Sequence, residues 1–275
     1  IKSIVMQRIY LSLILSMSIF CVAAQDDFPR STKKDHRYWF FGPGLSIQNM
    51  YDESISHVRY HGVGVSPLLG LLKMSEKKYR QFLLQPSFVT LKTDRSNDLR
   101  PMKVATTRIL LDYQYLVKVK NWDKDLGLWV GGDISLLFNL KRAPQLDNSQ
   151  LVYDYALSLG PSGKLDKGVH WNKRDCYFSW QLTLPLLSHV ARPYYLNRIE
   201  FIDPENNFVG DLFSNSQVVT VNKHFRITSG LSFTYPIFNK NLLRLQYGWD
   251  YYQTKTINKV YAAEHLVSIV FHSNY

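Results

Sequence analysis

Apolar and polar residues alternate with a period of two along most of this chain, which is the pattern of β-strands with two different faces. The alternation is clearest near the end of the chain. Within 225–235 and again within 243–252, the odd-numbered positions are mostly large and apolar, whereas the even-numbered positions are mostly polar or small. The short segment 238–241 lies between these runs, so we expect them to pair as a tight antiparallel hairpin.

The same alternation predicts further strands at 38–50, 57–72, 79–91, 108–118, 128–139, 153–160, 176–186 and 267–275. Pro86 is expected to interrupt the third strand or to force a bulge, because proline cannot donate a ladder hydrogen bond. Pro161, Ser162 and Gly163 are expected to end the sixth strand. The sequence therefore predicts an all-β chain of about ten strands.

The longest stretch without a clear pattern is 188–223. An extra hairpin built from 198–202 and 217–221 would raise the number of strands from ten to twelve, and bacterial single-chain barrels have even numbers. Both strand numbers remain open at this point, and we otherwise expect 188–223 to form a long loop.

The composition of the polar strand faces indicates whether the apolar faces meet lipid or the protein interior. They are rich in glycine, serine, threonine and glutamine rather than in lysine and glutamate. Small, uncharged polar side chains suit the interior of a narrow barrel, with the aromatic and aliphatic face turned to lipid. We therefore predict a transmembrane antiparallel up-and-down β-barrel. A soluble periplasmic lipocalin-like binder is the alternative, and it requires the aromatic faces to lie inside.

Residues 1–24 have the pattern of a secretory signal peptide. A basic residue, Arg8, follows the first plausible start at Met6, an apolar core covers 9–20, and small residues end at Ala24. That core is too short to span a bilayer comfortably. We expect the whole signal peptide to be removed. This leaves 25–275 as a single barrel domain with Cys176 as its sole cysteine and no internal disulfide.

The final strand carries Val267, Ile269 and Phe271 on one face and ends on the aromatic Tyr275. It resembles the closing strand of Gram-negative outer-membrane β-barrels, which alternates apolar residues and ends on an aromatic residue. The resemblance implies an integral protein of the bacterial outer membrane after signal-peptide removal. With the N-terminus in the periplasm, the loop at about 188–223 falls on the extracellular side, where such barrels have their longer loops.

The formal net charge is +11, of which Lys2 and Arg8 lie in the expected signal peptide, leaving +9 for residues 25–275. The basic residues are scattered rather than clustered with aromatic ones, so we expect no nucleic-acid partner. Outer-membrane lipid and the phosphates of lipopolysaccharide are the expected partners, with a small solute or another envelope protein as further possibilities. The alternative is that the basic turns only keep the chain soluble before insertion.

Seven charged residues are predicted to face the lumen: Arg108, Asp112, Asp133, Asp154, Arg226, Arg244 and Asp250. Charges removed from water need partners, and acids and bases are nearly balanced in this set. One interpretation is a mutually paired network that plugs the lumen, and the other is a narrow polar channel. Both require the same residue types, so the sequence does not separate them.

The sequence therefore favours a non-enzymatic barrel that is either a small porin-like pore or a structural or accessory envelope protein. We identify no catalytic residues, no metal ligands and no cofactor site. A barrel enzyme acting on lipid or peptide at the extracellular rim is the rival hypothesis. It requires that acids and histidines from the long loop and its flanks converge beside the lumen: Asp203, Glu205, Asp211, His189 and His224.

Overall fold

The computed structural model describes residues 35–93, 102–123, 126–145, 151–171, 174–192, 216–256 and 258–275. The expected signal peptide and the segment 198–202 lie outside these residues. No helix in the described part of the chain is long and apolar enough to cross a membrane.

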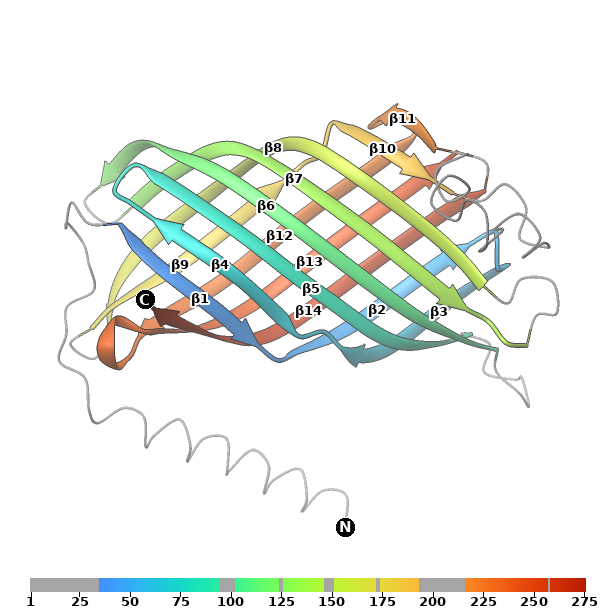
Figure 1. Ribbon diagram of the computed structural model, residues 1–275, viewed down its shortest axis with the longest axis horizontal. Helices are drawn as coiled ribbons and strands as arrows, with labels where there is room; N and C mark the ends of the chain where they lie inside the picture. The colour runs from blue at the N-terminus through green and yellow to red at the C-terminus, as the bar shows by residue number, and fades with distance from the viewer. Residues whose placement is uncertain are drawn as a thin grey trace, which may run out of the picture.

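The described chain folds into one antiparallel sheet that closes on itself (Figure 1). Its strands are β1 (His36–Gly42), β2 (Gly44–Asp52), β3 (Ser56–Val65), β4 (Leu68–Met74), β5 (Lys78–Thr93), β6 (Lys103–Asp123), β7 (Leu126–Arg142), β8 (Leu151–Trp171), β9 (Arg174–Thr183), β10 (Leu187–Ala191), β11 (Ser216–Thr220), β12 (His224–Pro236), β13 (Leu242–Lys255) and β14 (Lys259–Asn274). The sheet closes because β14 pairs with both β1 and β2.

Four pairs of these segments are interrupted halves of single barrel strands: β1 with β2, β3 with β4, β9 with β10, and β11 with β12. The first three pairs lie between the same neighbours on both sides, as β1 and β2 do between β14 and the β3/β4 strand, and β11 and β12 share the β9/β10 strand as their neighbour on one side. The barrel therefore has ten strands in up-and-down order, as the alternation predicts.

The twelve-strand alternative is wrong. Residues 216–220 form β11, which pairs with β10 and belongs to the barrel wall. Within the stretch 188–223, residues 188–191 and 216–220 are therefore strand and 221–223 form a turn, so the connection between β10 and β11 is confined to 192–215.

Two expectations about proline are also wrong. Strand β5 continues through Pro86, and β8 continues through Pro161 to Trp171. Pro86 lies within the segment 85–87 of β5. This segment has no ladder partner on the side of β3 and β4, because β3 ends at Val65 and β4 begins at Leu68. Pro161 likewise faces the break between β9 and β10. Each proline thus lies where the neighbouring strand is itself interrupted, so its missing N–H disturbs the ladder little.

The outer surface of the barrel is apolar. Trp39, Phe178 and Leu245 are 57%, 53% and 53% exposed, and they alternate with inward-facing neighbours. The inner side holds buried apolar clusters near both ends of the lumen, with polar residues between them. One cluster includes Tyr38 and Val270, and the other includes Ile55 and Val104. An apolar outside and a largely polar middle are the arrangement of a barrel surrounded by lipid, and the reverse of a lipocalin-like binder.

The two rims of the barrel differ in their connections. We call the rim that carries His36 and Asn274 the terminal rim and the opposite one the distal rim (Figure 1). Connections at the terminal rim are short: 75–77, 124–125, 172–173 and 237–241. The distal rim has the longer ones, including 94–102, 143–150 and 192–215.

Candidate functional site in the barrel lumen

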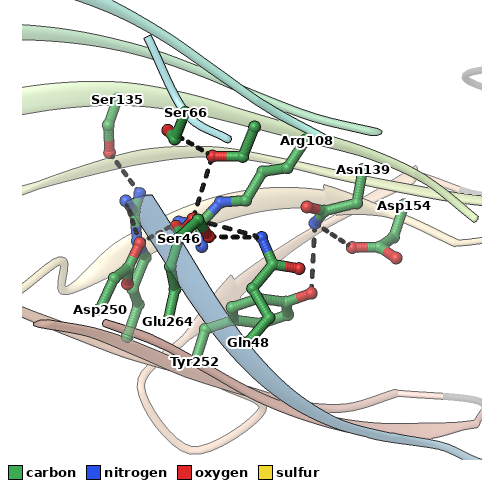
Figure 2. A network of polar contacts seen from close by, with 12 residues as sticks. Ser46, Gln48, Ser66, Arg108, Ser135, Asn139, Asp154, Asp250, Tyr252 and Glu264 are labelled. Atoms are coloured by element: carbon green, nitrogen blue, oxygen red, sulfur yellow. Dashed lines mark hydrogen bonds and ion pairs between the residues drawn. The ribbon is translucent and has the colours of Figure 1, made fainter. Parts of the chain in front are cut away.

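A network of salt bridges surrounds Arg108 inside the barrel (Figure 2). Arg108 extends from β6 and donates to Glu264 Oε2 of β14 at 2.6 Å and to Asp250 of β13. Arg226 of β12 donates to both carboxylate oxygens of Asp250, at 3.1 and 2.9 Å, and to the Ser135 hydroxyl of β7 at 3.0 Å. The four charged side chains are at most 12% exposed, so these contacts are shielded from water.

The contact between Arg108 and Asp250 crosses the lumen. Strands β6 and β13 are separated by β7, β8, β9/β10 and β11/β12 in one direction, and by β5, β3/β4, β1/β2 and β14 in the other. They therefore lie on opposite walls. A salt bridge between opposite walls occupies the width of the barrel at that level.

Neutral polar groups complete the surroundings of Glu264 (Figure 2). The Ser46 hydroxyl, Gln48 Nε2 and the Ser87 hydroxyl donate to Glu264 Oε1, the last two at 3.2 and 3.0 Å. Gln48 in turn accepts a hydrogen bond of 3.2 Å from the Thr106 hydroxyl. The carboxylate thus has both a charged partner and several neutral donors, as a buried acid requires.

A second salt-bridge cluster lies nearer the distal rim. Lys141 of β7 donates to Asp52 Oδ2 of β2 at 2.7 Å and to Asp154 of β8. Arg192, which follows β10, also donates to Asp52. Asn139 donates to Asp154 Oδ2 at 2.7 Å. This cluster likewise joins walls that are far apart in the sheet, because β2 and β7 are separated by β3/β4, β5 and β6 on the shorter side.

The structure places the seven residues of the sequence-based set inside the barrel, in three groups. Four take part in the salt bridges described above: Arg108, Asp154, Arg226 and Asp250. Asp112 and Asp133, on the adjacent strands β6 and β7, are within hydrogen-bonding reach of each other. Arg244 lies apart from these groups and donates to the Thr234 hydroxyl at 3.1 Å.

Sequence reasoning missed four charged members of the two clusters: Asp52, Lys141, Arg192 and Glu264. Asp52 and Lys141 lie two residues beyond the strand ends predicted at 50 and 139. Glu264 precedes the predicted start of the last strand at 267. Extending the period of two by one step at each end would have found Asp52 and Lys141, and further extension along the last strand would have found Glu264. Arg192 gave no such signal, because it fell in the expected loop.

A cavity of about 120 Å³ lies beside the Arg108 network, lined among others by Asp112, Gln114 and Arg226. Gly230 of β12 and Gly248 of β13 are direct cross-strand partners on its wall. A Cβ at Gly230 would meet nothing within 4 Å, so the absence of side chains there leaves the cavity open. Its polar lining and size suit a few water molecules.

The acids and histidines required by the hypothesis of an enzyme at the rim do not converge in the described part of the chain. His189 Nδ1 contacts the Tyr155 hydroxyl at 2.9 Å, whereas His224 is buried and contacts the Thr254 hydroxyl at 2.8 Å. Asp203, Glu205 and Asp211 lie outside the described residues. Among the residues described, no group of three or more histidine, cysteine or acidic side chains is placed to hold a metal ion.

No protein-family model matches the sequence, and no curated protein matches it significantly. Solved structures of similar shape include the outer-membrane protease OmpT from Escherichia coli, with 7% identity, a TM-score of 0.48, and 88% of this chain and 96% of that chain covered. The translocator domain of the autotransporter NalP from Neisseria meningitidis has 10% identity, a TM-score of 0.42, and coverage of 98% and 95%. The outer-membrane protein OprG from Pseudomonas aeruginosa has 8% identity, a TM-score of 0.35, and coverage of 90% and 99%.

With TM-scores below 0.5 these likenesses carry no argument, and the class of the protein follows from its own structure. A closed ten-strand antiparallel barrel with an apolar outer surface is a transmembrane β-barrel of the outer-membrane type.

Proposed function

We propose that this protein is a non-enzymatic barrel of the bacterial outer membrane whose lumen is closed by salt bridges between opposite walls. It acts as a structural or accessory component of the envelope and does not form an open pore. The contact of Arg108 with Asp250 and Glu264 is the observation that carries this proposal, because together with Arg226 it fills the lumen with buried, mutually neutralised charge.

The rest of the lumen supports the same function. A conducting pore needs a continuous polar path with room for hydrated solutes. Here the buried apolar clusters around Tyr38 and around Ile55 lie on either side of the charged layer. The second salt-bridge cluster, around Lys141, adds another contact between distant walls.

An enzyme at the rim has less support. The buried acids and bases are engaged with one another inside the barrel, and the two described histidines of that hypothesis have separate partners. A catalytic group must reach a substrate, and a charge buried and paired in the middle of the barrel does not. We therefore expect no hydrolysis of lipid or peptide.

Conductance across planar lipid bilayers tests the closed lumen directly. The purified full-length barrel is inserted into the bilayer, and the gel mobility of protein recovered from parallel liposomes verifies that it is folded. We expect no stepwise channel currents from the wild-type protein. Stable, reproducible single-channel steps from folded protein would contradict the proposal and favour the porin-like alternative.

A further inference from the structure

A hollow of about 820 Å³ lies on the outer surface of the barrel near the distal rim. Its outward-facing lining comes from four neighbouring strands and includes Tyr51, Arg59, His61, Tyr251, Lys259 and Tyr261. The hollow is separate from the lumen network, and nothing in the proposed function uses it.

The cross-strand register explains why the surface is hollowed at this point. Tyr251 is directly opposite Ala263, Ala263 is opposite Asn49, and Asn49 is opposite His61. Two small side chains therefore form the floor between an aromatic and an imidazole ring.

The next row towards the rim forms the upper wall of the hollow. Tyr261 is opposite Tyr51, and Tyr51 is opposite Arg59. The two tyrosine rings lie 5.8 Å apart between centroids. The row thus places two aromatic rings and a guanidinium side by side, between the floor and the rim.

Below the hollow the surface is mostly apolar, although His265, the cross-strand partner of Ile47, lies in the first row and contacts the Tyr247 hydroxyl at 2.7 Å. Ile47, Val63 and Val267 lie one or two rows further from the distal rim, and all three are exposed. The hollow thus lies at the boundary between the apolar band and the polar rim, where aromatic residues of such barrels meet lipid headgroups. An occupant that matches both surfaces would be amphipathic, with its apolar part along the band and its head in the hollow.

The charges around the hollow indicate which charge the head group of an occupant should carry. Lys255 is directly opposite Lys259, and Lys92 is directly opposite Lys103; all four are exposed on the outer face. Like charges in this position destabilise a sheet unless an anion lies between them. Glu53 is the acid that lines the hollow; it accepts a hydrogen bond of 2.9 Å from the Lys259 backbone N–H, whereas its carboxylate lies 3.9 Å from the Lys259 ammonium.

We propose that this hollow binds the phosphorylated head of an outer-leaflet glycolipid of the lipid A type. Arg59 and Lys259 bind phosphate, the guanidinium of Arg59 by the two-pronged geometry that suits a phosphate group. Tyr51 and Tyr261 provide flat amphipathic surface for the sugar rings. The distal rim carries the longer connections, as extracellular rims do, which places the hollow in the leaflet where such glycolipids reside.

Native mass spectrometry of the full-length barrel in detergent, with added bisphosphorylated lipid A, tests this site. The double variant R59Q/K259Q removes two charges from the hollow. The matched control R80Q/K78Q removes one arginine and one lysine, both exposed, at the terminal rim, where Arg80 stacks on Tyr115 as Arg59 adjoins Tyr51. Phosphatidylglycerol and lipid A without phosphate serve as competing probes.

We expect R59Q/K259Q to bind bisphosphorylated lipid A roughly 25-fold more weakly, about fivefold for each charge, while the control binds like the wild type. Lipid A without phosphate should bind weakly to all three proteins. An equal loss in the control would mean that only overall charge matters and would overturn the site. Undiminished binding by R59Q/K259Q would overturn it as well. Equal or tighter binding of phosphatidylglycerol would overturn the assignment to a glycolipid.

Discussion

Arg108 is shared by two acids, since its guanidinium contacts both Asp250 and Glu264, and Arg226 on Asp250 supplies the second positive charge. If Arg108 were absent, the two acids would keep different partners. Asp250 keeps the charged partner Arg226, whereas Glu264 keeps only neutral donors such as Gln48. A buried ion pair adds little net stability compared with apolar residues, but removing one partner leaves an uncompensated charge.

The variant Arg108→Leu should therefore lower the free energy of unfolding by about 3–5 kcal/mol, because Glu264 loses its charged partner. The double variant R108L/E264L should regain most of this loss. Tryptophan fluorescence during chemical unfolding in detergent measures both. A double variant as unstable as the single one would show that the penalty does not come from the unpaired acid.

Glycine on the inner face has two different roles in this barrel. A Cβ at Gly64 would lie 2.0 Å from the Phe88 carbonyl oxygen on the neighbouring strand, so only glycine permits that approach. At Gly230 the lumen is open instead.

Gly64→Ala should destabilise the barrel by roughly 1–3 kcal/mol through overpacking, whereas Gly230→Ala should change stability by less than about 0.5 kcal/mol. Thermal unfolding followed by gel mobility compares the two variants. Equal stability of both would contradict the close approach at Gly64.

At the scale of single strands, the alternation predicted the inward and outward sides from sequence, and the ten-strand barrel is confirmed. Strand ends and interruptions were harder to predict. A proline near the middle of a run is a sound signal of a broken ladder, but the sequence does not show whether its own strand or the neighbouring one is broken. At Pro86 and Pro161 the neighbouring strand is interrupted, at Pro67 and Pro185 respectively.

This arrangement predicts that proline has different effects at two positions of β5 that are two residues apart. Leu84 has the same alternation phase as Pro86 but is paired with Leu69 of β4. Leu84→Pro should cost several kcal/mol, because it leaves a carbonyl without its donor in a lipid environment, whereas Pro86→Leu should be nearly neutral. The yield of folded, heat-sensitive protein on gels compares the variants. A strongly destabilised P86L would refute the explanation.

The salt-bridge network could be predicted only in part. The phase of each strand indicated that Arg108, Arg226 and Asp250 share the interior. Which acid meets which base depends on the stagger of strands on opposite walls, and the local pattern carries no information about it. The contact between β6 and β13 is therefore visible only in the folded barrel.

In the whole molecule, the apolar face of the sheet points outwards, and this direction determines which surroundings the barrel requires. Trp39, Trp180 and Leu231 are exposed on the outside of the closed barrel and require lipid around them. A soluble protein with this surface would expose a large continuous apolar band to water and aggregate.

Cell fractionation followed by gel migration of the detergent-extracted protein, with and without boiling, tests that orientation most directly. We expect the protein in the outer-membrane fraction and a different mobility when unheated, because the closed ten-strand sheet resists detergent until it is heated. Protein found in the soluble periplasmic fraction, with the same mobility before and after boiling, would contradict the lipid-facing surface and the functions proposed from it.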